Sequence, residues 1–325
     1  MTRGRVLITS VFLFPGDEVD QLLRGAGFET VYRPWDGKLA EEDLIAMLHG
    51  IDGAIVAGDK FTPLVLQSAG KLKVVSRTGV GYDAIDVPAA TARGIAVCST
   101  PDVNKYSVAD WTIALIIQCA RKIVENETEV RAGRWTRIEG RELRDSTLGI
   151  IGFGSIGQEV ARRARAFGMR ILATDPRRDD ALAARNGVTY ASLEELLRQS
   201  DYVSLHTLLN KETRHLINAE RLALMRPTAY LINTSRGGVV DQEALYEVLR
   251  ERRIAGAALD VFEKEPLEKD SPLRTLDNLY ISAHTSGVTS DARSRSGRTA
   301  AENLIRVLNG ERPIHIVNPE VLPNR

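Results

Sequence analysis

Short apolar runs alternate with helical patterns along about the first third of the chain. Runs such as 6–9 and 53–57 have the length and β-branched content of buried strands, whereas 18–25 places its apolar residues at helical spacing. The predicted elements occupy residues 6–9, 18–25, 29–33, 41–49, 53–57, 64–69, 72–76, 89–93 and 95–98. Strands that alternate with helices predict a parallel sheet covered by helices on both faces. We therefore predict a first α/β domain of about 100 residues.

The alternation stops at Thr100-Pro101-Asp102 and resumes after a long apolar helix predicted at 108–123. Later elements are predicted at 148–151, 158–167, 171–173, 202–206, 219–224, 229–234, 242–250, 256–259 and 279–282. They predict a second doubly wound sheet. A final helix at 300–308 and the tail 316–319 have no strand nearby in sequence. We expect both segments to return and cover the first domain.

A glycine-rich turn follows the apolar run 148–151, with glycines at Gly152, Gly154 and Gly157. The first glycine permits a tight turn, the second lets the backbone approach a pyrophosphate, and the third lets helix and strand pack closely. Asp175 ends the next apolar run, 18 residues beyond Gly157, where it can accept hydrogen bonds from a ribose. Strand, glycine turn, helix and acid in this order predict a dinucleotide-binding βαβ unit.

Three polar segments follow predicted strands of the second domain, at 233–238, 260–266 and 284–287. Ligands of an open α/β sheet bind outside the carboxyl ends of its strands, so these segments are placed to form a site. Arg236 can bind a carboxylate or carbonyl oxygen, and His284 can deliver a proton to that oxygen as a hydride arrives. Glu265 can pair with the imidazole and fix its tautomer. These residue types are the ones that hydride transfer to a 2-oxo acid needs.

Motifs along nearly the whole chain support this interpretation. They are Ser76-Arg77-Thr78-Gly79-Val80-Gly81-Tyr82-Asp83, Asn104 with 107–110, the glycine turn, Asn233-Thr234-Ser235-Arg236-Gly237-Gly238, 258–262, His284 and 317–322. In these motifs the chain resembles the D-isomer-specific 2-hydroxyacid dehydrogenases, the family of phosphoglycerate dehydrogenase and glyoxylate/hydroxypyruvate reductase. The resemblance implies that Arg236, Glu265 and His284 are catalytic. It also implies a homodimer.

The resemblance implies the division of the chain as well. A discontinuous, flavodoxin-like substrate domain would comprise 1–102 and 291–325, and a Rossmann NAD-binding domain would comprise 103–290. Val80 and Gly81 would offer backbone N–H groups to the substrate carboxylate, with Asn104 and Arg236 also binding substrate. The residues implied to line the cofactor are Val108, Gly152, Gly154, Ser155, Ile156, Gly157, Asp175, His206, Thr207, Thr213, Thr234, Asp260, His284 and Gly287.

The substrate is left open between two classes of 2-oxo acid. The segment 56–60 lacks the arginine with which phosphoglycerate enzymes of the family hold the phosphate, and only Lys60 remains. The chain also has Leu208 where the family often has proline, a change that would alter the loop over the adenine. A general 2-oxo acid reductase, such as a glyoxylate/hydroxypyruvate reductase, and a phosphoglycerate dehydrogenase both fit.

The expected cofactor is NAD. Asp175 should repel a 2′-phosphate and accept the ribose hydroxyls. Arg177 and Arg178 follow closely and could hold the phosphate of NADP if Asp175 turned away. A cofactor-sensing binding protein resembling the corepressors of the same fold is the alternative from another functional class.

Composition excludes several other partners. Forty-three basic residues balance 43 acidic ones, so no net field draws the chain to nucleic acid or to a membrane surface. Cys98 and Cys119 are isolated, fit no metal or redox spacing, and are expected to be buried free thiols. We predict no metal. No secretory leader and no bilayer-spanning stretch stand out, so a cytoplasmic location is expected.

Overall fold

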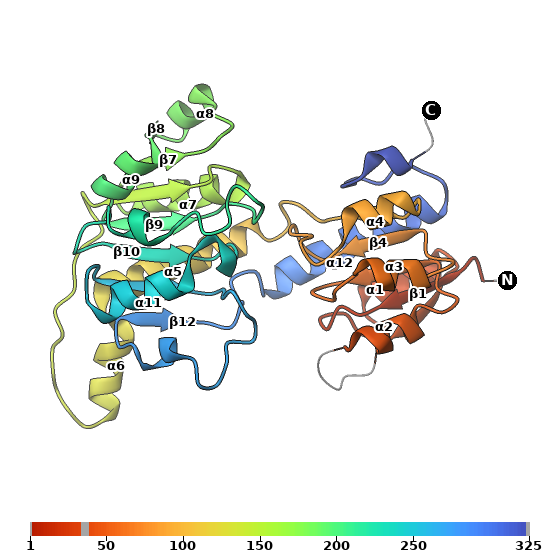
Figure 1. Ribbon diagram of the computed structural model, residues 1–325, viewed down its shortest axis with the longest axis horizontal. Helices are drawn as coiled ribbons and strands as arrows, with labels where there is room; N and C mark the ends of the chain where they lie inside the picture. The colour runs from red at the N-terminus through yellow and green to blue at the C-terminus, as the bar shows by residue number, and fades with distance from the viewer. Residues whose placement is uncertain (1, 34–38, 323–325) are drawn as a thin grey trace. The chain divides into compact units, whose positions relative to one another are not determined.

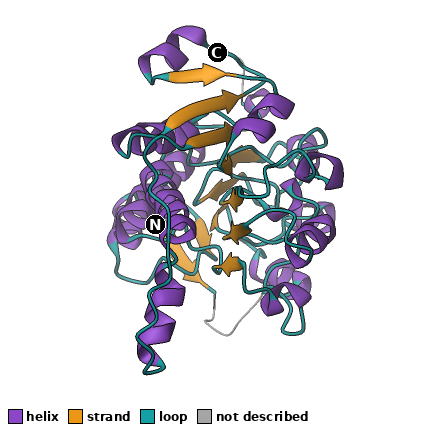
Figure 2. Ribbon diagram, turned by 90° about the vertical axis from the view of Figure 1, so that its left-hand side faces the viewer, coloured by secondary structure: helices purple, strands orange, loops and turns teal. Residues whose placement is uncertain are grey.

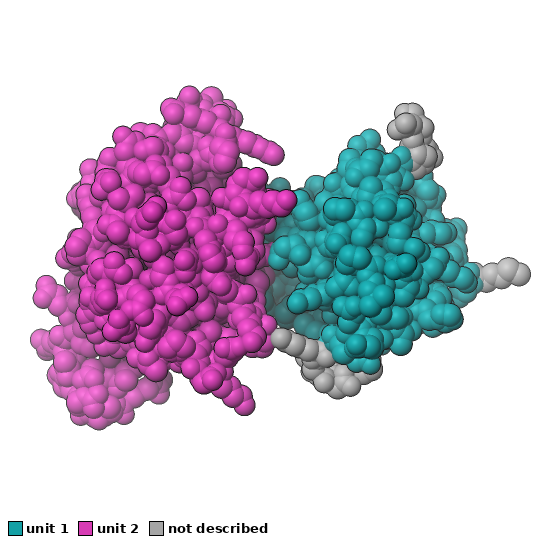
Figure 3. Space-filling model, viewed as in Figure 1, with its two compact units in different colours: residues 1–104, 288–325 teal, residues 105–287 magenta. Residues whose placement is uncertain are grey.

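The computed structural model describes residues 2–33 and 39–322. It divides into two compact units, shown in different colours in Figure 3. The first unit comprises Met1–Asn104 and Val288–Arg325, and the second comprises Lys105–Gly287. That the first unit holds the substrate and the second the cofactor remains a prediction.

The first unit is built on a parallel sheet of five strands. They are β1 (Arg5–Ile8), β2 (Glu29–Tyr32), β3 (Gly53–Val56), β4 (Val74–Arg77) and β5 (Ala96–Cys98). Its helices are α1 (Glu18–Gly25), α2 (Glu41–Met47), α3 (Pro63–Ser68), α4 (Val87–Ala92) and α12 (Ser290–Leu308). The order β2-β1-β3-β4-β5 is the flavodoxin-like order, and all four pairs are parallel. The predicted fold of this unit is confirmed.

The carboxyl end of the chain packs on the first unit, as predicted. In α12, the Ala300 carbonyl accepts a hydrogen bond from the Ser76 hydroxyl of β4 at 2.8 Å. The tail then runs beside the edge strand β5, where Val317 N–H donates to the Val97 carbonyl at 2.8 Å. Asn318 is buried, and its Oδ1 accepts from Val97 N–H at 2.7 Å. These bonds satisfy backbone groups that an uncovered edge strand would expose.

The second unit contains a parallel sheet of seven strands. They are β6 (Thr147–Ile151), β7 (Arg170–Thr174), β8 (Val188–Tyr190), β9 (Tyr202–Leu205), β10 (Tyr230–Asn233), β11 (Gly256–Leu259) and β12 (Leu279–Ile281). Its α-helices are α5 (Lys105–Arg121), α6 (Ile123–Arg131), α7 (Ser155–Ala166), α8 (Asp180–Arg185), α9 (Leu193–Gln199), α10 (Ala219–Leu222) and α11 (Gln242–Arg250). The strand order is β12-β11-β10-β9-β6-β7-β8. This is the second doubly wound sheet that the sequence predicts.

Burial explains why the central strands are so apolar. Every residue of β6 is buried. Two consecutive residues of the strand, Ile150 and Ile151, point to opposite faces of the sheet and pack into two different apolar clusters. Figure 2 shows helices on both sides of the strands. A strand covered on both faces reads as a continuous apolar run, which is the pattern on which the sequence prediction rested.

Among the α-helices and strands of the described residues, α6, α8, β8 and α9 were not predicted. Helix α6 is mostly polar, and α8 spans only six residues, so neither shows a clear apolar periodicity. The predicted helix 108–123 ends instead at Arg121, because Lys122 adopts a left-handed conformation with φ +52° that breaks it from α6. The last helix begins at Ser290 rather than at 300, since its first half is rich in serine and arginine.

Both cysteines are buried and free, as predicted. Burial raises the pKa of the Cys98 and Cys119 thiols to about 12. Neither thiol is therefore ionised near neutral pH, and nucleophilic chemistry at these residues is disfavoured. Within the described ranges, no helix is both long and apolar enough to cross a membrane.

Candidate active site

The predicted site residues of the second unit follow the carboxyl ends of its parallel strands. Along that edge of the sheet, His284 follows β12, Asp260 follows β11 and Arg236 follows β10. His206 follows β9, and the glycine turn follows β6. The chain runs from β6 outward to β8 and then crosses to β9 on the other side of β6. This reversal is the topological switch point where doubly wound sheets bind their ligands.

A different geometric feature explains why glycine occupies each of the three positions of the turn. Gly152 has φ +94°, and a Cβ there would lie 2.7 Å from the carbonyl of His206. Gly154 is the N-cap of α7, and nothing beyond its neighbours in the chain lies within 4 Å of the position that a Cβ would take. A Cβ on Gly157 would lie 2.3 Å from the Gly152 oxygen. The turn is tight, the helix is close to it, and the open position leaves the helix N-terminus accessible to an anion.

The Asp175 carboxylate is fixed by the backbone at the end of β7. Its Oδ2 accepts a hydrogen bond from Phe153 N–H at 2.8 Å, and its Oδ1 accepts one from Arg177 N–H at 2.7 Å. The Arg178 guanidinium is held by Asp180 at 2.7 Å and lies over the Tyr190 ring. The carboxylate therefore keeps its orientation toward the glycine turn and retains lone pairs for hydroxyl donors.

Two buried polar atoms beside the switch point have no hydrogen-bond partner among the described residues. They are Nδ1 of His206 and Oγ1 of Thr207, both just after β9. The other ring nitrogen of His206, Nε2, is bonded to Ser204 Oγ at 2.9 Å. Burial lowers the pKa of His206 to about 3, so the ring is neutral. Buried polar groups in proteins are normally hydrogen-bonded, and these two atoms beside the open glycine turn fit a dinucleotide that would supply partners.

The other residues expected at the cofactor lie in the same unit. Thr234 is buried, and its hydroxyl is 3.1 Å from that of Thr112 in α5. Thr213 fixes the loop after β9, since its hydroxyl donates to the Leu208 carbonyl at 2.5 Å. Val108 is buried in α5. Ser155 and Ile156 form the first turn of α7, and Gly287 is the last residue of the unit. Their contact with a cofactor remains a prediction.

His284 and Glu265 form a hydrogen-bonded pair. The Nδ1 of His284 lies 2.8 Å from Glu265 Oε2, and both side chains are partly exposed. The other carboxylate oxygen of Glu265 accepts from Phe262 N–H at 3.0 Å. Burial favours the neutral acid, but the hydrogen bonds from His284 and Phe262 outweigh it and lower the pKa of Glu265. The carboxylate thus supports a proton on Nδ1 and leaves Nε2 to face a ligand.

Arg236 lies in a turn that is held by Asn233, the buried last residue of β10. Asn233 Nδ2 donates to the Arg236 carbonyl at 2.9 Å, and its Oδ1 accepts from Ser235 N–H at 3.0 Å. The next residue, Gly237, packs so closely that a Cβ would lie 1.9 Å from the Phe262 carbonyl carbon. The Arg236 charge also contributes to the lowered pKa of Glu265. The structure therefore brings together the three residues that the sequence predicts as catalytic.

Sequence reasoning missed two supports of this arrangement. Asn233 could have been found, because Asn-x-Ser after a strand is typical of a side-chain-stabilised turn. The bonds of Asp260 to the segment that carries His284 had no sequence signal, since Ser282 is 22 residues away. Within the described ranges, no cluster of three or more His, Cys, Asp or Glu side chains could hold a metal.

The residues expected to bind the substrate carboxylate lie in the first unit. Val80 and Gly81 follow β4, and the Thr78 hydroxyl anchors their loop by donating to the Val56 carbonyl at 3.1 Å. Among the described residues, neither Val80 N–H nor Gly81 N–H donates a hydrogen bond. Asn104 is the last residue of the unit's amino-terminal segment. Two adjacent free N–H groups suit an anionic oxygen.

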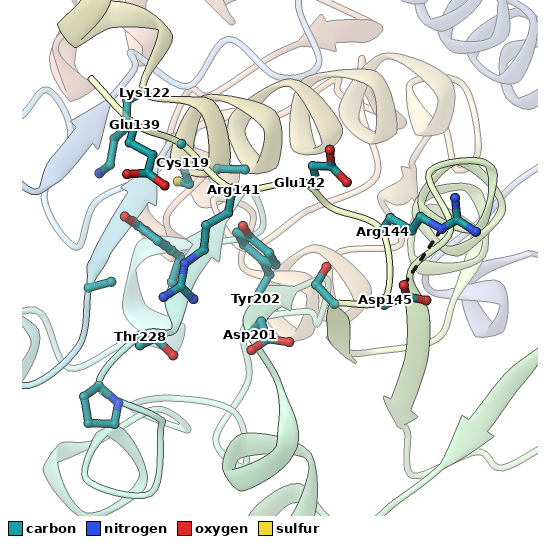
Figure 4. A pocket seen from close by; sticks show the side chains of 16 residues that line it. Cys119, Lys122, Glu139, Arg141, Glu142, Arg144, Asp145, Asp201, Tyr202 and Thr228 are labelled. Atoms are coloured by element: carbon teal, nitrogen blue, oxygen red, sulfur yellow. Dashed lines mark ion pairs between the residues drawn. The ribbon is translucent and has the colours of Figure 1, made fainter. Parts of the chain in front are cut away.

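Each unit also has a surface cavity. In the first unit, Lys60 and Tyr82 line a cavity of about 540 Å³. In the second, a cavity of about 430 Å³ lies where Thr228 and Tyr202 stand near the amino ends of their strands (Figure 4). The second cavity holds none of the predicted site residues and lies at the sheet edge opposite to them. Lys122, at the base of α6, is among its lining residues.

Fold and site define a two-unit α/β protein with a dinucleotide-binding unit that carries a histidine–carboxylate pair and an arginine. Residues 113–286 match the family model "D-isomer specific 2-hydroxyacid dehydrogenase, NAD binding domain". The chain belongs to this family and is an NAD(P)-dependent D-2-hydroxyacid dehydrogenase.

Similar proteins include enzymes of both expected substrate classes. The chain is 42% identical over 333 residues to a glyoxylate reductase of Thermofilum pendens, an alignment covering 100% of this chain and 97% of that protein. It is 43% identical to a D-3-phosphoglycerate dehydrogenase of Methanocaldococcus jannaschii over 88% of this chain and 55% of that protein. A D-lactate dehydrogenase from Aquifex aeolicus, solved with NAD and lactic acid, is 32% identical with a TM-score of 0.85, covering 96% and 99% of the two chains.

Proposed function

We propose that this protein reduces small, unphosphorylated 2-oxo acids, glyoxylate foremost, with NADH. The observation that carries the proposal is the His284–Glu265 pair at 2.8 Å, beside Arg236 at the carboxyl ends of β10–β12. This is a proton donor, its orienting carboxylate and an anion-binding group in one place. The similarity to a glyoxylate reductase over nearly the full length of both chains supports the substrate class.

The geometry supports the following proposed roles. A bound nicotinamide cofactor supplies the hydride to C2 of the substrate. His284, held through Nδ1 by Glu265, donates the proton on Nε2 to the oxygen on C2 and takes it back in the oxidative direction. Glu265 stabilises the charged imidazole before that proton leaves. Arg236 stabilises the negative charge that develops on the oxygen.

The absence of an arginine from 56–60 supports an unphosphorylated substrate. Lys60 is the cation of that segment, and it shares its cavity with Asp83 and Asp86, which oppose a second negative charge. A lysine is a point charge and lacks the fork with which arginine binds phosphate oxygens. We propose that glyoxylate and hydroxypyruvate are therefore better substrates than phosphohydroxypyruvate.

The hydrogen bonds of Asp175 support NADH over NADPH. NADPH would need Asp175 to turn away from its 2′-phosphate, and that movement would leave the Phe153 and Arg177 N–H groups without their acceptor. Arg178, one of the two cations that could bind the phosphate, is already paired with Asp180. Keeping Asp175 in place would instead put two negative charges together.

A substrate panel tests the proposed function. NADH and NADPH oxidation are followed with glyoxylate, hydroxypyruvate, pyruvate, 2-oxoglutarate and 3-phosphohydroxypyruvate at several concentrations. We expect kcat/KM to be highest with glyoxylate or hydroxypyruvate, and at least about tenfold higher with NADH than with NADPH. Turnover confined to phosphohydroxypyruvate would refute the substrate class. Tight NADH binding without turnover of any acid would favour the cofactor-sensing alternative.

We also propose that the protein is a homodimer through α6. Figure 1 shows this helix projecting from its unit, and none of its residues is buried. Ile123 and Val130, seven residues apart, lie on one helix face and are 49% and 52% exposed, and Trp135 beyond them is 80% exposed. An apolar face of this kind on a short helix is usually covered by a partner.

Replacing Ile123 and Val130 together by glutamate should produce a monomer, because two charges would be buried at the interface. Light scattering after size-exclusion chromatography measures the mass. The matched control is Leu64→Glu on α3, which changes a 57% exposed leucine outside the proposed interface and should leave the dimer intact. A monomeric unmodified protein would contradict the proposal.

A further inference from the structure

Asp260 is a fully buried carboxylate whose two oxygens are both engaged by a single turn. Its Oδ1 accepts from Thr285 N–H at 2.9 Å and from the Ser282 hydroxyl at 2.5 Å, while Oδ2 accepts from Ser286 N–H at 2.8 Å. The Asp260 carbonyl also accepts from His284 N–H at 2.8 Å. One residue at the end of β11 therefore bonds four residues of the segment after β12.

These bonds surround a backbone conformation that needs support. His284 has φ +54°, in the left-handed region that residues other than glycine seldom occupy. Such a conformation persists only where the surrounding structure holds it. The His284 ring reaches Glu265, which belongs to a different loop, so the 2.8 Å separation depends on the path of the 282–286 backbone.

The charge state of Asp260 suits this task. Burial favours the neutral acid, but the hydrogen bonds from Ser282, Thr285 and Ser286 outweigh it and lower the pKa of the carboxyl group. Asp260 is thus ionised at neutral pH and bonds its donors with charge-assisted strength. The lost solvation of a buried charge is compensated only while the turn keeps its present conformation.

We propose that Asp260 is a positioning residue: its carboxylate holds the 282–286 turn so that the His284 imidazole faces Glu265 and the substrate. The inference rests on the proposed catalytic role of His284. It differs from a role in lining the cofactor, which would act on cofactor affinity, whereas a positioning role acts on turnover and on the mobility of the turn.

Asp260→Asn separates these roles, because an amide oxygen can accept from Thr285 or Ser286 N–H, but its NH2 group must then face the other donor. We expect kcat to fall about 100-fold, as a misplaced catalytic group implies, with the NADH dissociation constant changed less than about threefold. The Thr285 and Ser286 amides should exchange hydrogen faster, which NMR measures without any turnover. Ser282→Ala, a milder change that tests the same turn if Asp260→Asn does not fold, should give the same pattern with a smaller loss of kcat.

Asp201→Asn is the matched control. Asp201 also accepts a backbone hydrogen bond, from Thr147 N–H at 2.8 Å, but at the amino ends of the strands. The Asp201→Asn variant should leave kcat and the hydrogen exchange of the Thr285 and Ser286 amides unchanged. Weaker NADH binding in Asp260→Asn with unchanged kcat and unchanged exchange would overturn the proposal. If the unmodified protein reduces no 2-oxo acid, the proposed function fails, while the exchange rates still decide whether Asp260 holds the turn.

Discussion

His284→Asn should lose about 10²–10⁴-fold in kcat for 2-oxo acid reduction, the range expected when a general acid is removed. Asparagine is the informative replacement, because it tolerates the left-handed backbone that His284 adopts at φ +54° better than most residues. The variant therefore removes the proposed proton donor without adding backbone strain. Its NADH dissociation constant and melting temperature should stay near those of the unmodified protein, as fluorescence titration and calorimetry would show.

The chain contains a matched control for this experiment. His215 is also left-handed, with φ +49°, and its Nε2 lies 3.0 Å from Glu263 in the same unit. His215→Asn makes the same chemical change at a second histidine that lies beside a glutamate, one that has no proposed part in proton transfer and no hydrogen bond at Nε2 among the described residues. It should retain kcat within about threefold. Equal losses in the two variants would mean that the His284 effect is structural rather than chemical.

Much of this arrangement could be predicted because it depends on local sequence patterns. The glycine turn with Asp175 specifies its own conformation through backbone geometry within a few residues, and the structure has that geometry at Gly152 and Gly157. Arg236 and His284 could be placed because parallel strands deliver their carboxyl ends to one edge of a sheet. A strand prediction is enough to bring such residues together.

The bonds that support the site could not be predicted, because they join segments that are far apart in the sequence. Asp260 and Ser286 are 26 residues apart, and their bond depends on the pairing of β11 with β12 and on the path of the loop between them. Likewise, the orphaned Nδ1 of His206 follows from burial that only the packed structure reveals. Sequence patterns located the candidate site residues, whereas tertiary packing decides how their side chains are held.

Arg236→Lys should lower kcat/KM for glyoxylate by about 10²–10³-fold, although the positive charge is kept, since loss of one preorganised donor to a developing oxyanion has that cost. The guanidinium offers a planar fork of donors, while an ammonium is a point charge on a flexible stem. The turn itself should survive, because Asn233 bonds the Arg236 carbonyl and not its side chain. NADH binding and thermal stability should therefore change little.

Arg214→Lys provides the control, since the Arg214 guanidinium lies beside Gly238 of the same turn and undergoes the same chemical change. Steady-state kinetics of both variants with glyoxylate distinguishes a directional role of one guanidinium from a general need for positive charge near the turn. We expect Arg214→Lys to keep kcat/KM within about threefold. If Arg236→Lys also stayed within that limit, charge alone would suffice, and the proposed alignment of the arginine fork with the substrate oxygen would be wrong.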